Sequence, residues 1–415
     1  MHPPRDLTLP EPGSQTARRV LGAYLKRTVA DFLKLPARRF DSPAADDYGA
    51  LRTIVDGLSR SSNAGLVFSM MRQVTLSTLV RCIDAELWGA GNVVKLDSWL
   101  TELNGLVAFE LAAAGALPSG GVRLRRAPER LLSPTSNIAL TVPSGFTLSF
   151  QNGRVTAEQG ASTIELHLDA LGPGDLVDVP GLGVARPYHP IVADLTLALL
   201  DNNPLSGEEA HPDKQGNAIV LGEHPVAHWT TALRDAHQLV ATYLPDLAEE
   251  MRLVLQLLVP VGYDPERHLS ASYAEAIGIA YLSLHPDPMT MAEALIHEFS
   301  HNKLNALQRL DPILENAFSP LFSSPVRPDP RPLYGVLLAV HAFTPVARLY
   351  ELMTAAGDPL SRSPSFARRK RHILTGNHEA VTTLTEHARP TPIGRGVLDE
   401  LRRWDAHYAA ARSNT

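Results

Sequence analysis

The residues with the clearest chemical potential are the five consecutive residues His297-Glu298-Phe299-Ser300-His301. In a helix, side chains four positions apart lie on one face, one turn apart, so the two imidazoles of this H-E-x-x-H motif can share a metal ion. A glutamate between such histidines is the general base of zinc peptidases, where it activates a metal-bound water. The motif therefore predicts a metal site, with Glu298 as its candidate catalytic residue.

The segment around the motif has the signals of a helix of roughly 20 residues. Thr290 and Glu293 form a capping-box pattern at its start, and Asp311-Pro312 supplies a stop. A strand is predicted just before it, over residues 276–284, and His285 at the end of that strand is a candidate for lining the site. Several apolar side chains are expected to pack the helix, namely Leu295, Ile296, Phe299, Leu304 and Leu307.

Two histidines do not complete a metal site, so the third ligand decides the chemistry. In a metzincin, a glycine and a third histidine would stand at Leu304 and Leu307, which excludes that class. A thermolysin-like glutamate is missing at the expected distance downstream, since Glu351 lies on a later helix. The better candidate is His341, in the middle of an apolar helix that opens at Pro332. Its other possible role is that of a buried, hydrogen-bonded core histidine.

The predicted His341 helix also carries a proline and two arginines. Pro345, four residues after His341, is expected to bend the helix beside that imidazole. Arg348 is seven residues after His341 and shares its face, and Arg331 stands at the helix start. These arginines either cap carbonyls and pair with acids such as Glu351, or supply a bidentate fork for a carboxylate close to the metal.

The helices and strands expected from the sequence indicate an α+β protein that is mostly helical. It has a β-rich middle region and carries the metal site in its C-terminal half. We expect a loose polar arm over residues 1–15, a helical region over 16–116 and a β-rich region over 117–186. A loop-rich connection with one helix at 191–200 follows over 187–224, and a mainly helical metal-binding domain covers 225–415. Within the β-rich region, Asn152-Gly153 is a strong hairpin signal.

Composition excludes several classes of protein. Lys+Arg total 38 against 44 Asp+Glu, a net charge of −6, so there is no basic excess for binding nucleic acid. The single cysteine, Cys82, rules out a disulfide framework and a cysteine-based metal site within one chain. The first residues are polar and proline-rich, and no apolar run reaches the length of a membrane span. We therefore expect a soluble, cytoplasmic protein without a membrane partner.

The order of these motifs carries a resemblance to a known family. HEFSH, then DPRP at 329–332, then GVLLAVHAF on an apolar helix resembles the H-E-x-x-H family of bacterial peptide-modifying proteins, over roughly residues 225–390. These accompany ribosomally made, post-translationally modified peptides, and they include iron(II)- and 2-oxoglutarate-dependent peptide β-hydroxylases.

The resemblance implies that His297, His301 and His341 hold iron, leaving positions for 2-oxoglutarate and dioxygen. It implies that Arg331 or Arg348 binds the distal carboxylate of 2-oxoglutarate, and that Glu298 orients a ligand or the substrate backbone. The substrate would be a precursor peptide, with or without a leader bound by the β-rich region. An extended segment of that peptide could pair with the strand at 277–284.

A second hypothesis comes from a different class, because three histidines suit zinc as well as iron. It is a zinc hydrolase, a peptidase that uses His297, Glu298 and His301. A third reading is an inactive scaffold that keeps the motif for structural reasons. The missing downstream glutamate, the central His341 and the arginines on its helix favour the hydroxylase.

Overall fold

The computed structural model describes residues 5–36, 42–88, 92–168, 178–179, 182–206, 219–322 and 330–413. The protein is a mixed α+β protein that is mostly helical and has several sheets in the middle of the chain, which confirms the predicted fold class. Residue 329, the start of the DPRP segment, and residues 207–218 of the expected connection lie outside the described residues.

The chain divides into two compact units. The HExxH unit consists of Met1–Tyr24, Pro190–Leu197 and Ile219–Thr415, and the accessory unit consists of Leu25–His189 and Ala198–Ala218. The predicted helical and β-rich regions thus belong largely to one unit. The predicted metal-binding domain additionally takes in the N-terminal segment and two strands from the expected connection.

The accessory unit contains the helices and strands that precede residue 186, apart from the first part of α1. Its helices are α1 (Thr16–Lys34, shared with the other unit), α2 (Pro43–Ser59), α3 (Ala64–Arg72), α4 (Val74–Trp88) and α5 (Val93–Ala113). One sheet has the order β1-β4-β5-β6, with β1 (Val122–Leu124), β4 (Thr147–Gln151), β5 (Arg154–Gln159) and β6 (Ser162–His167). The other has the order β2-β3-β8-β7, with β2 (Arg130–Ser133), β3 (Ile138–Thr141), β8 (Leu182–Ala185) and β7 (Asp178–Val179).

The predicted hairpin is present in this unit. Gln151 pairs with Arg154 across Asn152-Gly153, and Gly153 has a φ of 72°, a conformation that costs glycine little. The helices and sheets of the accessory unit share one apolar core, in which Phe109 of α5 and Phe150 of β4 are fully buried.

The HExxH unit is built on a five-stranded sheet of order β12-β13-β11-β10-β9. The strands are β9 (Tyr188–Val192), β10 (Leu195–Ala198), β11 (Leu257–Tyr263), β12 (Ser270–Ala271) and β13 (Ile279–Leu284). The central strands β10, β11 and β13 are parallel, and all six residues of β13 are buried, as expected for a parallel strand in the interior of a sheet. This confirms the predicted strand before the H-E-x-x-H helix.

One local prediction in this sheet is wrong. The expected helix at 191–200 is instead the end of β9 followed by β10, separated by a turn in which Asp194 has a φ of 65°. Its apolar residues alternate with others and are buried at Ile191, Leu195 and Leu197, which is the period of a strand.

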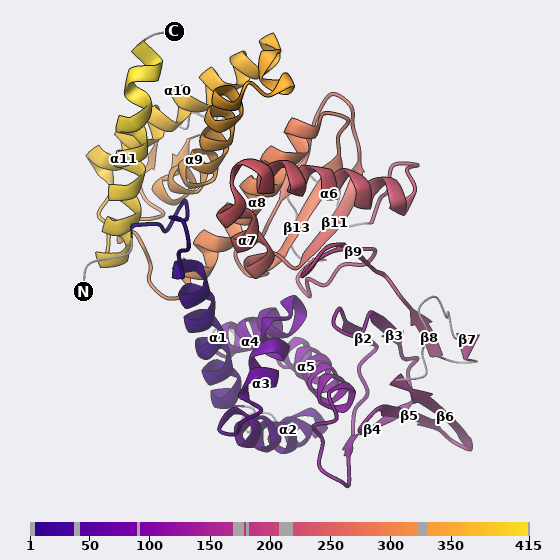
Figure 1. Ribbon diagram of the computed structural model, residues 1–415. Coiled ribbons are helices and arrows are strands. Elements are labelled where there is room, and N and C mark those ends of the chain that lie inside the picture. The colour runs from indigo at the N-terminus through magenta and orange to yellow at the C-terminus, as the bar shows by residue number, and fades with distance from the viewer. Residues whose placement is uncertain are drawn as a thin grey trace. The chain divides into compact units, whose positions relative to one another are not determined.

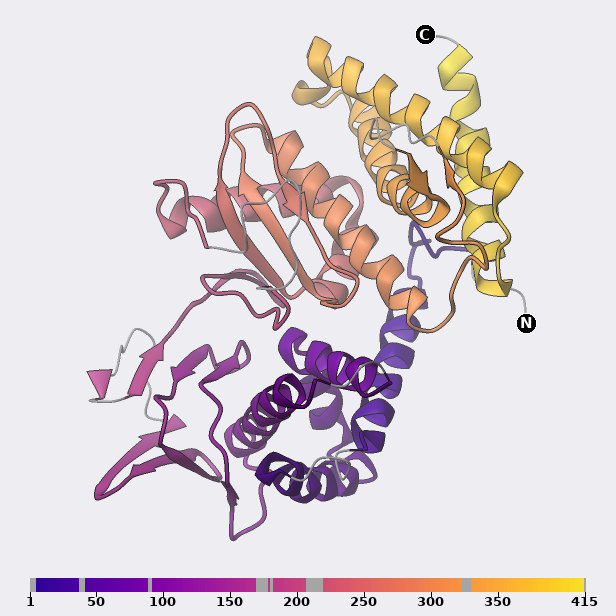
Figure 2. The same ribbon diagram turned by 180° about the vertical axis from the view of Figure 1, so that it is seen from behind.

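Helices make up the rest of the HExxH unit. They are α6 (Val226–Tyr243), α7 (Pro245–Val254), α8 (Pro288–Gln308), α9 (Leu333–Ala356), the short 3-10 helix η3 (Pro359–Arg362), α10 (Pro364–His387) and α11 (Pro392–Ser413), with a two-stranded β14 (Leu321–Phe322) and β15 (Arg331–Pro332) ahead of α9. Within this unit, α8 packs on α6 and α9, and α9 in turn contacts α10 and α11 (Figures 1 and 2). Helix α9 is therefore enclosed by its neighbours.

Helix α9 is also the one single helix of the described residues that is long and apolar enough to cross a membrane, although the bent pair α3–α4 meets the criterion jointly. Of its most apolar window, 67% is buried inside the protein, as in the core helix of a soluble protein. It ends where predicted, at Gly357, whose φ of 69° forms a left-handed cap.

Candidate metal centre

Helix α8 holds the H-E-x-x-H motif, as predicted. It begins at Pro288 because the Asp287 side chain caps it, accepting a hydrogen bond from the Met289 N–H at 2.9 Å. The capping box expected at Thr290 and Glu293 is therefore wrong, and Glu293 has a different partner. The five apolar residues expected to pack the helix are all buried.

The two motif histidines face each other on one side of α8. The Nε2 atoms of His297 and His301 lie 2.8 Å apart, and their ring centroids are separated by 4.3 Å. Both residues are half-buried, and Nδ1 of His301 is buried without a hydrogen-bond partner among the described residues. Two ring nitrogens this close either share one proton or point at a common ligand, and both arrangements need uncharged rings.

Their surroundings keep both rings uncharged at neutral pH. Burial lowers the pKa of His301 to about 4. The pKa of His297 is lowered well below its usual value, first by burial and then by His301, Arg369 and His268. A neutral imidazole with an available lone pair is the form that binds a metal ion.

A cluster from α9 and α10 stands beside His297. The Phe343 ring lies 4.9 Å from the His297 ring, and the Arg369 guanidinium lies 5.5 Å above the Phe343 ring. Arg369 donates from Nε and Nη2 to the Glu293 carboxylate, at 3.0 and 2.7 Å, and the Tyr350 hydroxyl donates to the same carboxylate. The result is a fixed positive group close to the histidine pair.

Arg369 is a residue of this cluster that the sequence analysis did not single out. Arg368 and Arg371 are exposed, but Arg369 is half-buried. It follows the buried Phe366 by three positions and precedes the buried Ile373 by four, so it lies on the packed face of α10. That spacing was a readable signal.

A cavity of about 440 Å³ adjoins this cluster. Its walls include Arg369, Glu293, His268 and His285, so His285 lines a cavity as anticipated. Burial lowers the pKa of His268 to about 4, and its Nε2 is buried without a hydrogen-bond partner among the described residues. Arg369 lines this cavity and also lies over the Phe343 ring that contacts His297, whereas neither His297 nor His301 is among the residues that line it.

His341 lies on a different face of α9. It is fully buried, and its Nε2 donates to the Leu7 carbonyl over 3.3 Å. Two residues turn a helix by about 200°, so His341 and Phe343 lie on different faces of α9. Burial lowers the pKa of His341 to about 3, and both His301 and the Ser300 backbone contribute to that pKa, so His341 is nevertheless close to α8. No group of three His, Cys, Asp or Glu side chains in the described part of the chain is arranged to hold a metal ion. Ligation by His341 stays a prediction.

The contact with Leu7 corrects the expected N-terminal arm. Leu7, Thr8 and Leu9 are buried, with exposed fractions of 1%, 0% and 6%. The Glu400 carboxylate accepts hydrogen bonds from the Thr8 and Leu9 N–H groups, both at 2.9 Å. The alternation of leucines around a threonine has the period of an extended strand, which the surrounding prolines obscured.

The two predicted cosubstrate arginines have different surroundings. Arg348 shares the His341 face of α9, donates to Glu351 at 2.7 Å and lies 5.6 Å from the Trp404 ring, which matches the ion-pair alternative. Arg331 lies in β15 and is half-buried. Glu298 is buried in α8 with an exposed fraction of 2%, so it is less accessible than either histidine next to it.

No protein-family model matches the sequence, and no curated protein is detectably similar to it.

Proposed function

We propose that this chain is an iron(II)- and 2-oxoglutarate-dependent dioxygenase that hydroxylates a β-carbon in a ribosomally synthesised precursor peptide. The observation that carries the proposal is the 2.8 Å approach of the His297 and His301 Nε2 atoms, next to a cavity that Arg369 lines. Neutral imidazoles suit iron(II), and a guanidinium suits the carboxylate of an organic acid. An oxygenase with an acid cosubstrate needs both the imidazoles for the metal and the guanidinium for the acid, whereas a hydrolase needs only the imidazoles.

The histidine pair fits the metal by its donor chemistry, because both rings are neutral at pH 7 and both are accessible. His297 and His301 would hold the ion, and we leave His341 out of the proposed ligand set because its Nε2 is bonded to the Leu7 carbonyl. The metal and 2-oxoglutarate together supply the oxidising power when bound. The protein holds the ion, orients the acid and keeps the reacting side chain close.

Arg369 is the residue to which we assign a carboxylate of 2-oxoglutarate, in place of Arg331 or Arg348. Its charge reaches His297, and the charges of the other two are not among the influences on that ring. Glu293 occupies Nε and Nη2, which fixes the guanidinium plane and leaves Nη1 to donate to a ligand. The Phe343 ring contacts both Arg369 and His297.

The substrate side chain would enter the cavity of about 440 Å³. This volume lies within the range of about 300–1,000 Å³ that is usual for ligand pockets. Pairing of the peptide with β13 is not part of the proposal, because β13 is an interior strand with β11 on one side and β12 on the other. The protein would act in the cytoplasm, where precursor peptides are made.

The zinc peptidase hypothesis requires Glu298 to touch water at the metal. Burial of Glu298 opposes that role, and we assign it a positioning role inside α8 instead. Its carbonyl accepts a hydrogen bond from Asn302 Nδ2 at 2.8 Å, and Asn302 Oδ1 accepts from the Gly278 N–H ahead of β13. Residue 298 thus stands where α8 is tied to the sheet.

The test is anaerobic reconstitution of the full-length protein with iron(II) and 2-oxoglutarate. We expect a weak visible charge-transfer band and, with oxygen and a precursor peptide encoded beside its gene, succinate release. Arg369→Gln should weaken 2-oxoglutarate binding by about tenfold or more, the loss of a charge-assisted pair. Arg368→Gln, the exposed neighbour, is the matched control and should behave as wild type.

Two results would contradict the proposal. One is the absence of the band and of succinate release from iron-loaded protein. The other is peptide hydrolysis by zinc-loaded protein that is lost in Glu298→Gln, because it would establish the peptidase.

A further inference from the structure

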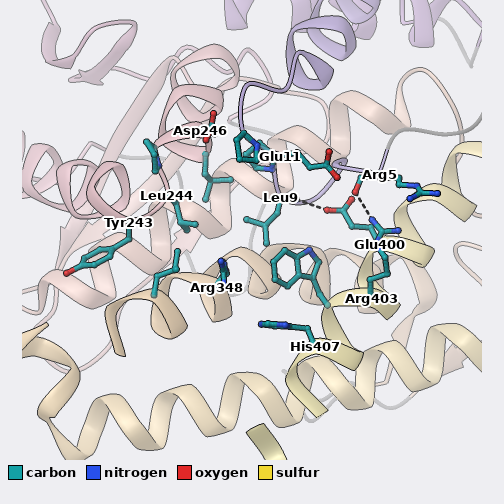
Figure 3. A pocket seen from close by; sticks show the side chains of 16 residues that line it. Arg5, Leu9, Glu11, Tyr243, Leu244, Asp246, Arg348, Glu400, Arg403 and His407 are labelled. Atoms are coloured by element: carbon teal, nitrogen blue, oxygen red, sulfur yellow. Dashed lines mark hydrogen bonds between the residues drawn. The ribbon is translucent and has the colours of Figure 1, made fainter. Parts of the chain in front are cut away.

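The HExxH unit has a second and larger cavity, of about 570 Å³, apart from the histidine pair. Its walls come from the N-terminal segment, from the α6–α7 junction, and from one face each of α9 and α11 (Figure 3). Leu9 and Glu11 stand above Arg348 and His407 in this view, with Tyr243 and Leu244 at one side. Neither motif histidine lines it.

Three arginines line this cavity and retain hydrogen-bond donors. Arg348 uses Nη1 for Glu351, and Arg403 uses Nη2 for the Arg5 carbonyl at 2.7 Å. Each guanidinium has five N–H donors, so both keep donors for a ligand. Arg5 is exposed at the same wall. His407, the remaining basic residue, is bonded to Glu351 through Nε2 at 2.8 Å.

Arg348 is paired with Glu351, but among the described contacts the acidic residues that line the cavity form no ion pair with the three arginines. Both Glu400 oxygens accept backbone N–H groups, and Asp246 Oδ1 accepts the Gly13 N–H at 3.1 Å. Burial raises the pKa of Glu400 to about 7, so its carboxyl is only partly charged near neutral pH. Glu11 is exposed to solvent. The cavity therefore offers more positive donors than its own acids consume.

The other walls are apolar, and this combination identifies the kind of ligand. Carbon-rich side chains from three segments line the cavity, namely Leu9, Pro10, Pro12, Leu244, Pro245, Leu247 and Leu352. A small dicarboxylate would leave most of this surface in contact with water. An acidic side chain flanked by apolar residues would satisfy the arginines and cover the leucines and prolines at once.

We propose that this cavity binds an acidic side chain of a peptide, with the Arg348 and Arg403 guanidiniums donating separately to its carboxylate and to its backbone carbonyls, and the proline- and leucine-lined walls on its apolar neighbours. The inference rests on the proposed function in that the peptide would be a part of the precursor substrate away from the reacting residue. It does not depend on the metal, because none of its groups belongs to the histidine pair.

Calorimetric titration of the full-length, metal-free protein tests the proposal. The probes are acetyl-Leu-Glu-Leu-amide, its glutamine analogue acetyl-Leu-Gln-Leu-amide, and succinate. We expect the glutamate peptide to bind about tenfold more tightly than the other two probes. The glutamine peptide lacks the carboxylate, and succinate lacks the apolar side chains. Quenching or a shift of Trp404 fluorescence, absent in Trp404→Phe, would place the ligand in this cavity.

Variants on α11 supply matched controls. Arg403→Gln should weaken the glutamate peptide by about tenfold. Arg402→Gln removes the same charge one residue away, from a side chain that pairs with Asp399 and does not line the cavity, and should leave binding unchanged. Arg348→Gln is a second variant that should repeat the Arg403→Gln result if Arg403 perturbs the N-terminal segment.

The proposal is overturned if the glutamate and glutamine peptides bind alike, or if Arg402→Gln and Arg403→Gln lose affinity equally. Succinate binding as tight as the peptide would assign the cavity to small dicarboxylates instead. Any of these results can coexist with an iron–2-oxoglutarate band, so failure here is distinguishable from failure of the proposed function.

Discussion

The polar groups on the two faces of helix α9 have different surroundings. The face of Phe343 and Tyr350 adjoins half-buried histidines, a guanidinium with spare donors and a cavity. The face of His341 meets the buried N-terminal segment, where the Leu7 carbonyl accepts from His341 and the Thr8 carbonyl accepts from Lys303 at 3.4 Å. On this second face His341 Nε2 and Lys303 Nζ have backbone partners, whereas His341 Nδ1 is buried without a hydrogen-bond partner among the described residues.

This difference distinguishes residues that could bind a ligand from residues that stabilise the fold. Tyr350 and Arg369, on the Phe343 side, line a cavity, whereas Lys303 near His341 is buried and paired with Glu250 at 2.7 Å. We therefore propose metal chemistry on the Phe343 side and assign a structural role to the buried contacts of His341 and Lys303 with the N-terminal segment.

The largest effect we expect is on the Phe343 face. His297→Ala or His301→Ala should lower iron(II) affinity by more than about 100-fold, because loss of even an outer partner of a ligand costs about 10–100-fold. His378→Ala, an exposed histidine paired with Asp405, should retain wild-type affinity. Metal content after anaerobic gel filtration is the measurement. Retention of one equivalent of iron in both motif variants would show that this histidine pair does not bind the metal.

Breaking the buried ion pair tests the His341 face. Lys303→Met leaves the Glu250 carboxylate buried without its cation, and should reduce the free energy of unfolding by about 3–5 kcal/mol. Arg18→Met, which breaks an exposed pair with the neighbouring Glu249, should cost no more than about 1 kcal/mol. Urea denaturation measures both. Equal losses in the two variants would mean that the buried face is not a structural support.

The raised pKa of Glu400 should make the stability of the protein depend on pH. The pKa of Glu400 is about 7 in the folded protein, against 4.5 for an ordinary glutamate. Between these two pH values the folded state therefore keeps a proton on Glu400 that the unfolded state has released. Stability should therefore fall as pH rises from about 4.5 to about 7, by about 3 kcal/mol for this group. Glu400→Gln should abolish that part of the slope, while Asp399→Asn, an exposed neighbour, should keep it. Identical slopes in all three proteins would show that Glu400 titrates normally.

The sequence was sufficient for the elements near the motif, because each has strong local signals. The strand β13, helix α8 with its paired histidines, and helix α9 between Pro332 and Gly357 all lie where the periodicity and the breakers put them. The period of apolar residues and the positions of proline and glycine are properties of a few consecutive residues. Such features need no knowledge of the tertiary fold.

The arrangement around the histidine pair could not be predicted in the same way. His341 and Phe343 are two residues apart, and which of them turns toward α8 depends on how α9 is rotated about its axis. The same holds for Arg369, whose partner Glu293 is 76 residues away. The burial of Leu7 likewise depends on helices near the other end of the chain.

The most direct test of this account is the iron(II) affinity of His341→Ala beside that of His301→Ala, measured anaerobically at pH 7. We predict that His341→Ala stays within about threefold of wild type, since the Leu7 carbonyl already occupies its Nε2, while His301→Ala loses the metal. Loss of iron in both variants to the same extent would contradict the separation of the two faces and establish His341 as the third ligand.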